Sequence, residues 1–154
     1  MKRYNKDSKE VKIGNDAELR LLSLLNDELS LDKIFIRRGM NNPSANGILG
    51  DILLSESEVD APSVGIEVKS STSKYVNTVC ISEFELCNSK ARWLAVTNED
   101  ASFGWRFFTM EDAKSNCEQK GNDSRVYYVV HHDKCKNITF RELIAEIRCL
   151  FPVK

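Results

Sequence analysis

One short stretch of the sequence, VGIEVKS from Val64 to Ser70, decides how the chain is expected to fold. Its β-branched residues predict a strand, and successive side chains of a strand point to opposite faces of the sheet. The apolar residues at even positions therefore share one face, whereas Glu67 and Lys69 share the other face with Gly65. A carboxylate and an ammonium on one face are unusual in a core, and the glycine leaves room for another group to approach closely. This face is the first candidate functional site.

A second strand is predicted over GDILLS, residues 50–55, and an acidic connection that contains Pro62 separates it from the first. We expect the two strands to pair antiparallel, which brings the carboxylate of Asp51 beside that of Glu67. Neighbouring carboxylates repel each other, and this repulsion raises their pKa values unless a cation joins them. Mg²⁺ suits such a pair because it prefers oxygen ligands and keeps several waters that a phosphate can displace.

The first helix supplies a third acidic candidate. Apolar residues recur at helical spacing between Ile13 and Leu29, which predicts an amphipathic helix whose apolar face packs on a core. Glu18 borders that face, so it reaches the same ion or its water shell if the helix packs near the ends of the two strands. A solvated helix residue is the alternative explanation for Glu18, and the sequence leaves this alternative open.

The rest of the chain predicts an α/β fold in the order αβββαββαβα, with a mixed central sheet flanked by helices. Two serine/threonine-to-glutamate spacings, Ser82 to Glu85 and Thr139 to Glu142, are typical of capping boxes and mark two helix starts. Glu85 is thereby explained as a cap residue and is not assigned to catalysis. The strands are expected at residues 34–39, 50–55, 64–70, 92–98, 104–110 and 125–131, and the helices at residues 13–29, 81–90, 111–119 and after Thr139.

The overall composition restricts the classes of function. The chain has 154 residues, with 22 basic against 23 acidic side chains and a formal net charge of -1 at pH 7. A global excess of Lys and Arg is excluded, so any nucleic-acid binding has to come from local placement. No run approaches the roughly 20 apolar residues of a membrane span, and the start MKRYNKDSKE lacks the apolar region of a secretory signal. We expect a cytoplasmic or otherwise intracellular protein that makes no contact with membranes.

The sequence indicates a single domain. No repeat or linker divides the chain, so we expect a polar basic tail over residues 1–12 and a single domain over residues 13–154.

The five cysteines form no CxxC pair and no zinc-like spacing with histidine, and an odd number forms no closed disulfide set. We expect reduced, mostly buried thiols, with His131 and His132 at the surface. A catalytic cysteine–histidine pair is the less favoured alternative.

The residues identified above resemble the PD-(D/E)XK nuclease superfamily. Its pattern is a helical Glu, an Asp that opens one strand and (D/E)-x-K on the next strand, which correspond here to Glu18, Asp51, Glu67 and Lys69. The resemblance covers roughly residues 11–100, through GNDAE, GDILL, IEVKSS and ISEFE. One departure is the glycine that precedes the strand Asp, where the family name has proline. The GNDAE helix and EVK strand are similar to archaeal-type Holliday-junction resolvases, and ISEFE is similar to restriction-like domains of larger defence or repair proteins.

This resemblance implies a restriction-endonuclease-like fold and a Mg²⁺-dependent DNA endonuclease that acts in restriction, repair or recombination, including junction resolution. Mg²⁺, for which Mn²⁺ can substitute, would be held by Asp51, Glu67 and the backbone carbonyl of Val68. The ion would stabilise charge on the phosphate and lower the pKa of a bound water. Lys69 would orient that water or offset negative charge in the transition state. Glu18 would bind a second ion or a metal-bound water.

Contacts with DNA away from the metal are expected from local basic residues. Arg37 and Arg38 end a strand just before a polar loop, and Lys74 follows the EVK strand, so all three are expected to meet phosphates. A solvated surface charge is an equally good explanation for each of them. Because a domain of this size has one site, we expect a homodimer for symmetric cutting of two strands, unless a larger defence or repair complex supplies DNA binding.

Two other classes of function remain open at this point. A nuclease-like domain can bind DNA or a protein partner without cutting, and the sequence sign of such a module is the loss of catalytic residues. Asp51, Glu67 and Lys69 are all present. A structural subunit that assembles through the final helix is not distinguished by the sequence.

Overall fold

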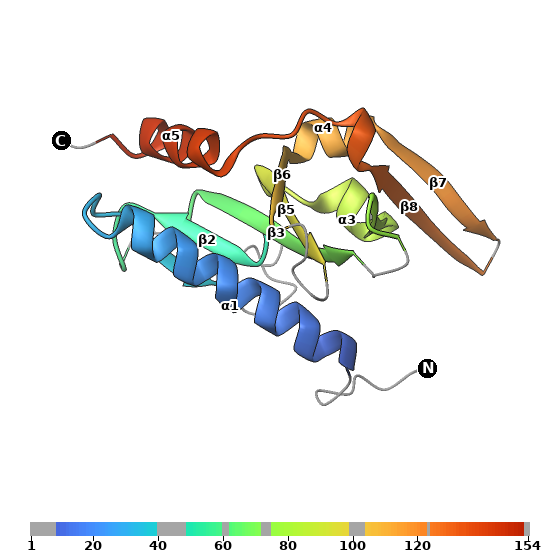
Figure 1. Ribbon diagram of the computed structural model, residues 1–154, viewed down its shortest axis with the longest axis horizontal. Helices are drawn as coiled ribbons and strands as arrows, with labels where there is room; N and C mark the ends of the chain where they lie inside the picture. The colour runs from blue at the N-terminus through green and yellow to red at the C-terminus, as the bar shows by residue number, and fades with distance from the viewer. Residues whose placement is uncertain are drawn as a thin grey trace.

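The computed structural model describes residues 9–39, 49–59, 62–71, 75–98, 104–122 and 124–152. Helices are interspersed among runs of two to four strands along the chain (Figure 1). The elements are α1 (Lys9–Leu29), β1 (Phe35–Arg38), β2 (Ile52–Ser55), β3 (Val64–Ser71), β4 (Thr78–Ser82), α3 (Glu83–Asn88), β5 (Trp93–Asn98), β6 (Arg106–Thr109), α4 (Met110–Ser115), β7 (Cys117–Asn122), β8 (Arg125–His131), the short 3-10 helix η1 (His132–Lys134) and α5 (Phe140–Leu150).

A five-stranded mixed sheet forms the centre of the fold, in the order β1-β2-β3-β5-β6. β3 and β5 pair parallel, whereas the other neighbouring strands of this sheet pair antiparallel. The expected antiparallel pairing of β2 with β3 is confirmed, with Ile52 opposite Ile66. A parallel pair needs a crossover connection, and the segment that contains β4 and α3 supplies it. The predicted mixed central sheet flanked by helices is therefore confirmed.

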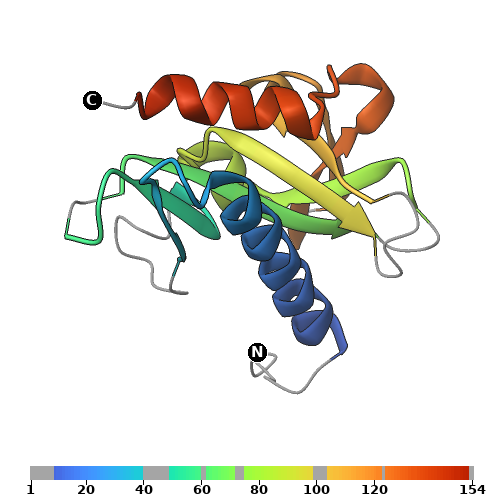
Figure 2. The same ribbon diagram turned by 60° about the vertical axis from the view of Figure 1, so that its left-hand side comes forward.

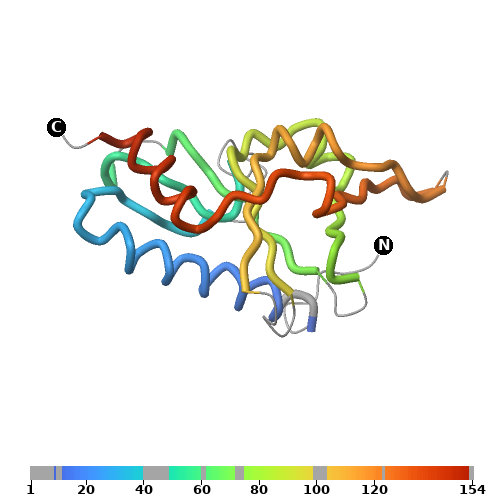
Figure 3. The backbone as a smooth tube through the Cα atoms, turned by 45° about the horizontal axis from the view of Figure 1, so that its top comes forward, coloured from blue at the N-terminus to red at the C-terminus, as the bar shows by residue number. Residues whose placement is uncertain are grey.

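Helices α1 and α5 contribute to a single core on one face of this sheet. The apolar stripe of α1, which includes the fully buried Leu21, joins Ile66 of β3, Trp93 of β5 and apolar residues of α5. Figure 2 shows α1 crossing the strands at an angle, with α5 beside them. Arg148 Nε of α5 lies 3.1 Å from Asp32 Oδ1, just after α1, and thereby joins the two helices at one end (Figure 3).

A three-stranded antiparallel sheet, in the order β4-β8-β7, lies on the other face of the central sheet. Leu94 and Val96 of β5 form a second core with Val79 of β4 and with residues of β8 and α4. Glu67 lies opposite Leu94 in the β3–β5 ladder, and Lys69 lies opposite Val96. Because opposite residues of a ladder share a face, Glu67 and Lys69 are turned toward the second sheet.

The expected element order αβββαββαβα is wrong in one respect, because it lacks two strands of the second sheet. β4 occupies a region that was expected to be a polar stretch and the start of a helix, and α3 begins only at Glu83. β7 occupies part of the helix expected at residues 111–119, where α4 ends at Ser115. β7 is an edge strand with five of its six residues exposed, so it lacks the apolar alternation by which a strand is recognised.

Two helix starts agree with the prediction from the sequence, and a third differs. Both predicted capping boxes are present, at the starts of α3 and α5. α1 begins at Lys9 rather than at Ile13, so residues 9–12 of the expected tail are helical and residues 1–8 lie outside the described part of the chain. None of the described helices is long and apolar enough to cross a membrane.

Two expectations about burial are wrong. All five cysteines are free and none is fully buried; the exposed ones are Cys80, Cys87 and Cys149. His132 is buried rather than at the surface, because its ring packs against Phe108 and its Nδ1 lies 2.8 Å from an Arg106 guanidinium nitrogen. Burial and the Arg106 charge lower the pKa of His132 to about 4, so the imidazole is neutral at physiological pH.

Candidate active site

A glycine turn places Asp51 against strand β3. Gly50 has φ +122°, and a Cβ at this position would lie 2.7 Å from the carbonyl oxygen of Ile66. Proline is fixed near φ -65°, so it cannot adopt this turn, which explains the glycine where the superfamily pattern has proline. The Asp51 N–H donates to the Ile66 carbonyl at 2.9 Å, and Asp51 Oδ2 accepts from the Val68 N–H at 2.8 Å. Both hydrogen bonds fix the Asp51 carboxylate at the edge of β3.

Gly65 allows the chain before this turn to cross β3 at close range. A Cβ at Gly65 would lie 1.8 Å from the carbonyl oxygen of Leu49, which is far inside any allowed contact. The expected close approach of another group to Gly65 is therefore found, and the group is the backbone of Leu49. The absence of a side chain at Gly65 lets Leu49 pass and lets Gly50 and Asp51 follow it into the turn.

The structure brings the carboxylates of Asp51 and Glu67 together. Burial and the nearby negative charge of Asp51 raise the pKa of Glu67 from 4.5 to about 9, although Lys69 acts in the opposite direction. The Glu67 side chain is 14% exposed. At neutral pH the carboxyl group of Glu67 therefore keeps its proton unless a cation enters the site.

Glu18 joins the same acidic group from helix α1. Burial and the Asp51 charge raise the pKa of Glu18 to about 7, although a hydrogen bond from Arg38 favours the ionised form. Arg38 Nη2 of β1 donates to Glu18 Oε2 and also to Asn15 Oδ1 at 3.0 Å. Glu18 is thus held at the site by Arg38 and interacts with Asp51, so it is not a solvated helix residue.

The Lys69 ammonium lies near two acidic side chains, one closer than the other. Its Nζ lies 2.6 Å from Glu85 Oε2 and 3.8 Å from Glu67 Oε1. Burial lowers the pKa of Lys69, but the charges of Glu85 and Glu67 outweigh burial, so the net shift is upward and the ammonium stays charged. Burial of Glu85 is likewise outweighed by Lys69, which lowers the pKa of Glu85.

The sequence did not assign Glu85 to the site. Its spacing from Ser82 already explained it as a helix cap, and the cap is real: Glu85 Oε1 accepts from the Ser82 N–H at 3.2 Å. The contact with Lys69 uses the other oxygen and depends on the placement of α3 next to β3. The sequence contains no local signal of this long-range contact.

The acidic group has a donor set that fits a hard divalent cation. Asp51 and Glu67 supply carboxylate oxygens, and the Val68 carbonyl points to the same side of β3 as its N–H, toward Asp51. Within the described residues, no three His, Cys, Asp or Glu side chains converge closely enough to hold an ion on their own. Asp51 is instead shared between a pair with Glu67 and a pair with Glu18. Mg²⁺ is commonly held in this way, by one or two carboxylates with water and phosphate oxygens completing its shell.

Comparison with known proteins identifies the fold. No family model matches the chain, and a search of curated proteins finds no match. Among solved structures, D212, a nuclease from a fusselovirus, superposes with a TM-score of 0.61 at 14% identity, over 97% of this chain and 98% of D212. The chain has the restriction-endonuclease-like fold. The Holliday junction resolvase Hjc of Archaeoglobus fulgidus superposes with a TM-score of 0.48 at 16% identity, over 82% of this chain and 98% of Hjc.

The basic residues expected to contact DNA have different surroundings in this restriction-endonuclease-like domain. Arg37 is half-buried on β1, opposite Leu53 of β2. Arg38 is engaged by Glu18 and Asn15, so its charge is directed into the acidic group. Lys74 lies outside the described residues. The structure therefore places Arg38 at the site in a supporting position, and the DNA contacts of Arg37, Arg38 and Lys74 stay a prediction.

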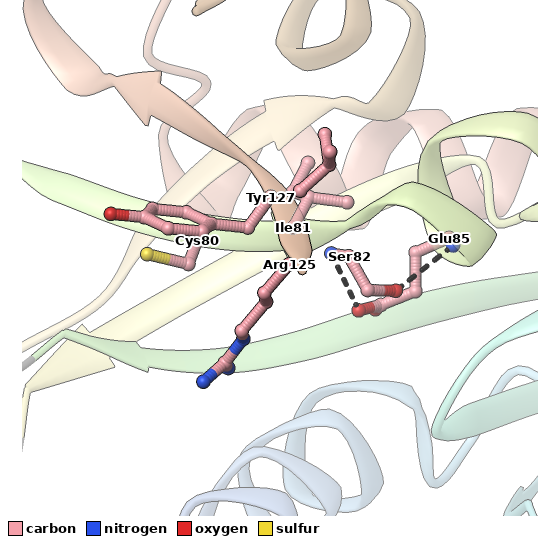
Figure 4. Close-up of a pocket in the computed structure, with 7 residues that line it drawn as sticks. Cys80, Ile81, Ser82, Glu85, Arg125 and Tyr127 are labelled. Atoms are coloured by element: carbon pink, nitrogen blue, oxygen red, sulfur yellow. Dashed lines mark hydrogen bonds between the residues drawn. The ribbon is translucent and has the colours of Figure 1, made fainter. Parts of the chain in front are cut away.

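A groove of about 470 Å³ opens next to the site, between β4, the start of α3 and β8. Figure 4 shows Glu85 at one end of this groove, hydrogen-bonded to Ser82, with Arg125 and Tyr127 projecting from β8. Glu85 belongs to both the groove and the site, because its Oε2 also binds Lys69 of β3. Its lining residues are Cys80, Ile81, Ser82, Glu85, Arg125, Val126 and Tyr127.

Proposed function

We propose that this protein is a Mg²⁺-dependent DNA endonuclease that hydrolyses phosphodiester bonds. The proposal is carried by the position of Asp51, whose carboxylate is fixed by the Val68 N–H and interacts with both Glu67 and Glu18. The Lys69 ammonium lies 3.8 Å from Glu67 on the same strand. Carboxylates that attract a hard cation beside an ammonium suit phosphodiester hydrolysis, because its transition state carries additional negative charge. The fold shared with a viral nuclease supports this function.

Each residue of the proposed site has a separate role. Asp51, Glu67 and the Val68 carbonyl would hold Mg²⁺, or Mn²⁺ as a substitute, which supplies positive charge at the scissile phosphate and acidifies a bound water. The Lys69 ammonium orients the attacking water and offsets charge on the phosphate oxygens. Glu18 would bind a second ion or a metal-bound water, and Arg38 holds its carboxylate in place.

The proposed substrate is DNA in restriction, repair or recombination, with four-way junctions among the candidates. Arg37, Arg38 and Lys74 are proposed to contact phosphates beside the site. A homodimer is proposed for cutting two strands, because a single site cuts one strand at a time and a twofold axis presents two sites. A larger defence or repair complex that supplies DNA binding would replace the second copy.

A cleavage assay tests the proposal. Purified protein is incubated with linear duplex, single-stranded, supercoiled and four-way-junction DNA in Mg²⁺, in Mn²⁺ or in EDTA. We expect cleavage in either metal and none in EDTA. Asp51→Asn and Lys69→Met should each remove most of the activity, since Asn keeps the hydrogen bond from Val68 but loses the charge.

A matched control uses the exposed ion pair on β7, in which Lys120 Nζ lies 3.1 Å from Glu118 Oε1. Glu118→Gln and Lys120→Met make the same chemical changes away from the site and should leave cleavage unchanged. Metal-independent cleavage, or equal activity of the Asp51 variant and the wild type, would contradict the proposed function. If the protein binds DNA but cleaves it in neither Mg²⁺ nor Mn²⁺, the non-catalytic binding module is favoured instead.

A further inference from the structure

Glu85 makes two contacts that are separable, one with each carboxylate oxygen. Oε1 accepts from the Ser82 N–H at 3.2 Å and completes the capping box of α3, in which Ser82 Oγ accepts from the Glu85 N–H at 3.1 Å. Oε2 lies 2.6 Å from Lys69 Nζ on β3. The first contact stabilises a short helix, whereas the second joins that helix to the proposed catalytic lysine.

The second capping box of the chain shows what a cap alone looks like. At the start of α5, Glu142 Oε1 accepts from the Thr139 N–H at 3.3 Å and Thr139 Oγ1 accepts from the Glu142 N–H at 3.1 Å. Glu142 is exposed and makes no ion pair with the described residues, whereas the side chain of Glu85 is only 22% exposed. Capping therefore does not require the burial or the ion pair found at Glu85.

The distances at Lys69 show which carboxylate holds the ammonium. The contact with Glu85 at 2.6 Å is a short, charged hydrogen bond, whereas 3.8 Å to Glu67 is too long for a hydrogen bond. A lysine bound mainly by Glu67 would compete with a cation for that carboxylate. Glu85 is instead the main partner of the ammonium, and the Glu67 side chain interacts with Asp51 and with Glu85.

We propose that Glu85 is a positioning residue, which holds the Lys69 ammonium in place beside Glu67. This inference rests on the proposed nuclease function. Glu85 touches neither the metal nor the scissile phosphate and acts through Lys69. A free lysine side chain samples many rotamers, and an ion pair at a helix N-terminus restricts it to the one beside Glu67.

The substitution Glu85→Gln separates the two roles. Glutamine also serves at this position of a capping box, so the variant keeps the cap and loses the negative charge. We expect kcat to fall about 10- to 100-fold, as for the loss of an outer partner of a metal site. The KM for DNA should change less than kcat, because the substitution alters the orientation of Lys69 rather than contacts with DNA. Glu85→Asp keeps the charge on a shorter side chain and should cleave faster than Glu85→Gln.

Two controls exclude a purely structural effect. Glu142→Gln makes the same change in the other capping box and should leave kcat unchanged. Ser82→Ala removes the cap of α3 while leaving Glu85 and Lys69 intact, so it should lower the unfolding temperature and retain most of kcat. A double-mutant cycle of Lys69→Met and Glu85→Gln, followed by thermal unfolding without metal, measures the ion pair independently of activity; the two changes should not be additive.

The outcomes distinguish this inference from the proposed function. Cleavage by the wild type with an unchanged kcat in Glu85→Gln would overturn the positioning role and leave the nuclease intact. An equal loss of kcat in Ser82→Ala and Glu85→Gln would assign the effect to the cap and also overturn it. If the wild type cuts no DNA in any metal while the cycle shows coupling, the proposed function fails and the pair is structural only.

Discussion

Binding of a divalent cation should release about one proton from the acidic group at pH 7.5. The pKa of Glu67 is raised to about 9 and that of Glu18 to about 7, because both are buried near Asp51. At pH 7.5 Glu67 is therefore mostly protonated, whereas Glu18 is mostly ionised. A cation held by ionised carboxylates displaces the bound proton, so about one proton should leave for each ion bound. The protons belong to the interacting group as a whole rather than to one residue.

Isothermal titration calorimetry with Mn²⁺ measures this number, because the apparent enthalpy depends on the ionisation enthalpy of the buffer in proportion to the protons released. Titrations in two buffers of different ionisation enthalpy at pH 7.5 are enough to obtain the number of protons released. At pH 9.5, which lies above the pKa of Glu67, the proton release should be much smaller than at pH 7.5 while the affinity for the cation rises. Glu67→Gln is the matched variant and should reduce the release at pH 7.5 to well below one proton, because Glu18 is mostly ionised at this pH.

Two results would refute the buried carboxylate pair as the metal site. If wild-type protein binds Mn²⁺ at pH 7.5 with no proton release, Glu67 is already ionised and the buried carboxylate pair is not the metal site. Release that is unchanged between pH 7.5 and pH 9.5 would place the proton on a group other than the acidic cluster. Either result would remove the electrostatic basis of the proposed site.

Stability and backbone geometry give further measurable outcomes. In EDTA the unfolding temperature should fall as pH rises from about 5 to 9, because native Glu18 and Glu67 keep protons that the unfolded chain has released; a flat or rising profile contradicts the buried acidic group. Gly65→Ala should cost about 1–3 kcal/mol or more in denaturant unfolding, since its Cβ meets the Leu49 carbonyl, whereas Gly14→Ala has open space in α1 and should stabilise by about 0.5–1 kcal/mol. Equal effects of the two substitutions would contradict the crossing of Leu49 over β3. Thr139→Ala should cost about 1 kcal/mol through loss of the α5 cap and leave DNA cleavage unchanged.

The central sheet could be predicted from the sequence because its strands carry buried apolar residues. All six residues of β5 are buried, and β3 alternates an apolar with a polar face. The strands of the second sheet show weaker sequence patterns. β4 has only two buried apolar residues, Val79 and Ile81, and its last residue, Ser82, is also the N-cap of α3, so the helix signal overlaps the strand. β7 contributes an exposed edge, which packing does not constrain.

The parts of the site that depend on neighbouring strands could be predicted, whereas those that depend on distant packing could not. The closeness of Asp51 to Glu67 follows from antiparallel pairing of β2 with β3. The contact of Glu85 with Lys69 requires α3 to pack beside β3, and the contact of Arg38 with Glu18 requires α1 to lie over β1. Arg38 was expected to contact DNA because its strand ends beside a polar loop, and only the packing of α1 shows that Glu18 engages it.

The local charge arrangement explains why a divalent cation suits this site. Two cations near Asp51 form close ion pairs, Arg38 with Glu18 and Lys69 with Glu85, so each pair is neutral. Asp51 and Glu67 then face each other, and this repulsion contributes to the raised pKa of Glu67. When both are ionised they carry a charge of about -2, which one divalent ion neutralises. Phosphate would meet net negative charge here without the ion, so EDTA should weaken DNA binding as well as stop cleavage; equal affinity for DNA with and without the metal would show that phosphate does not approach this site.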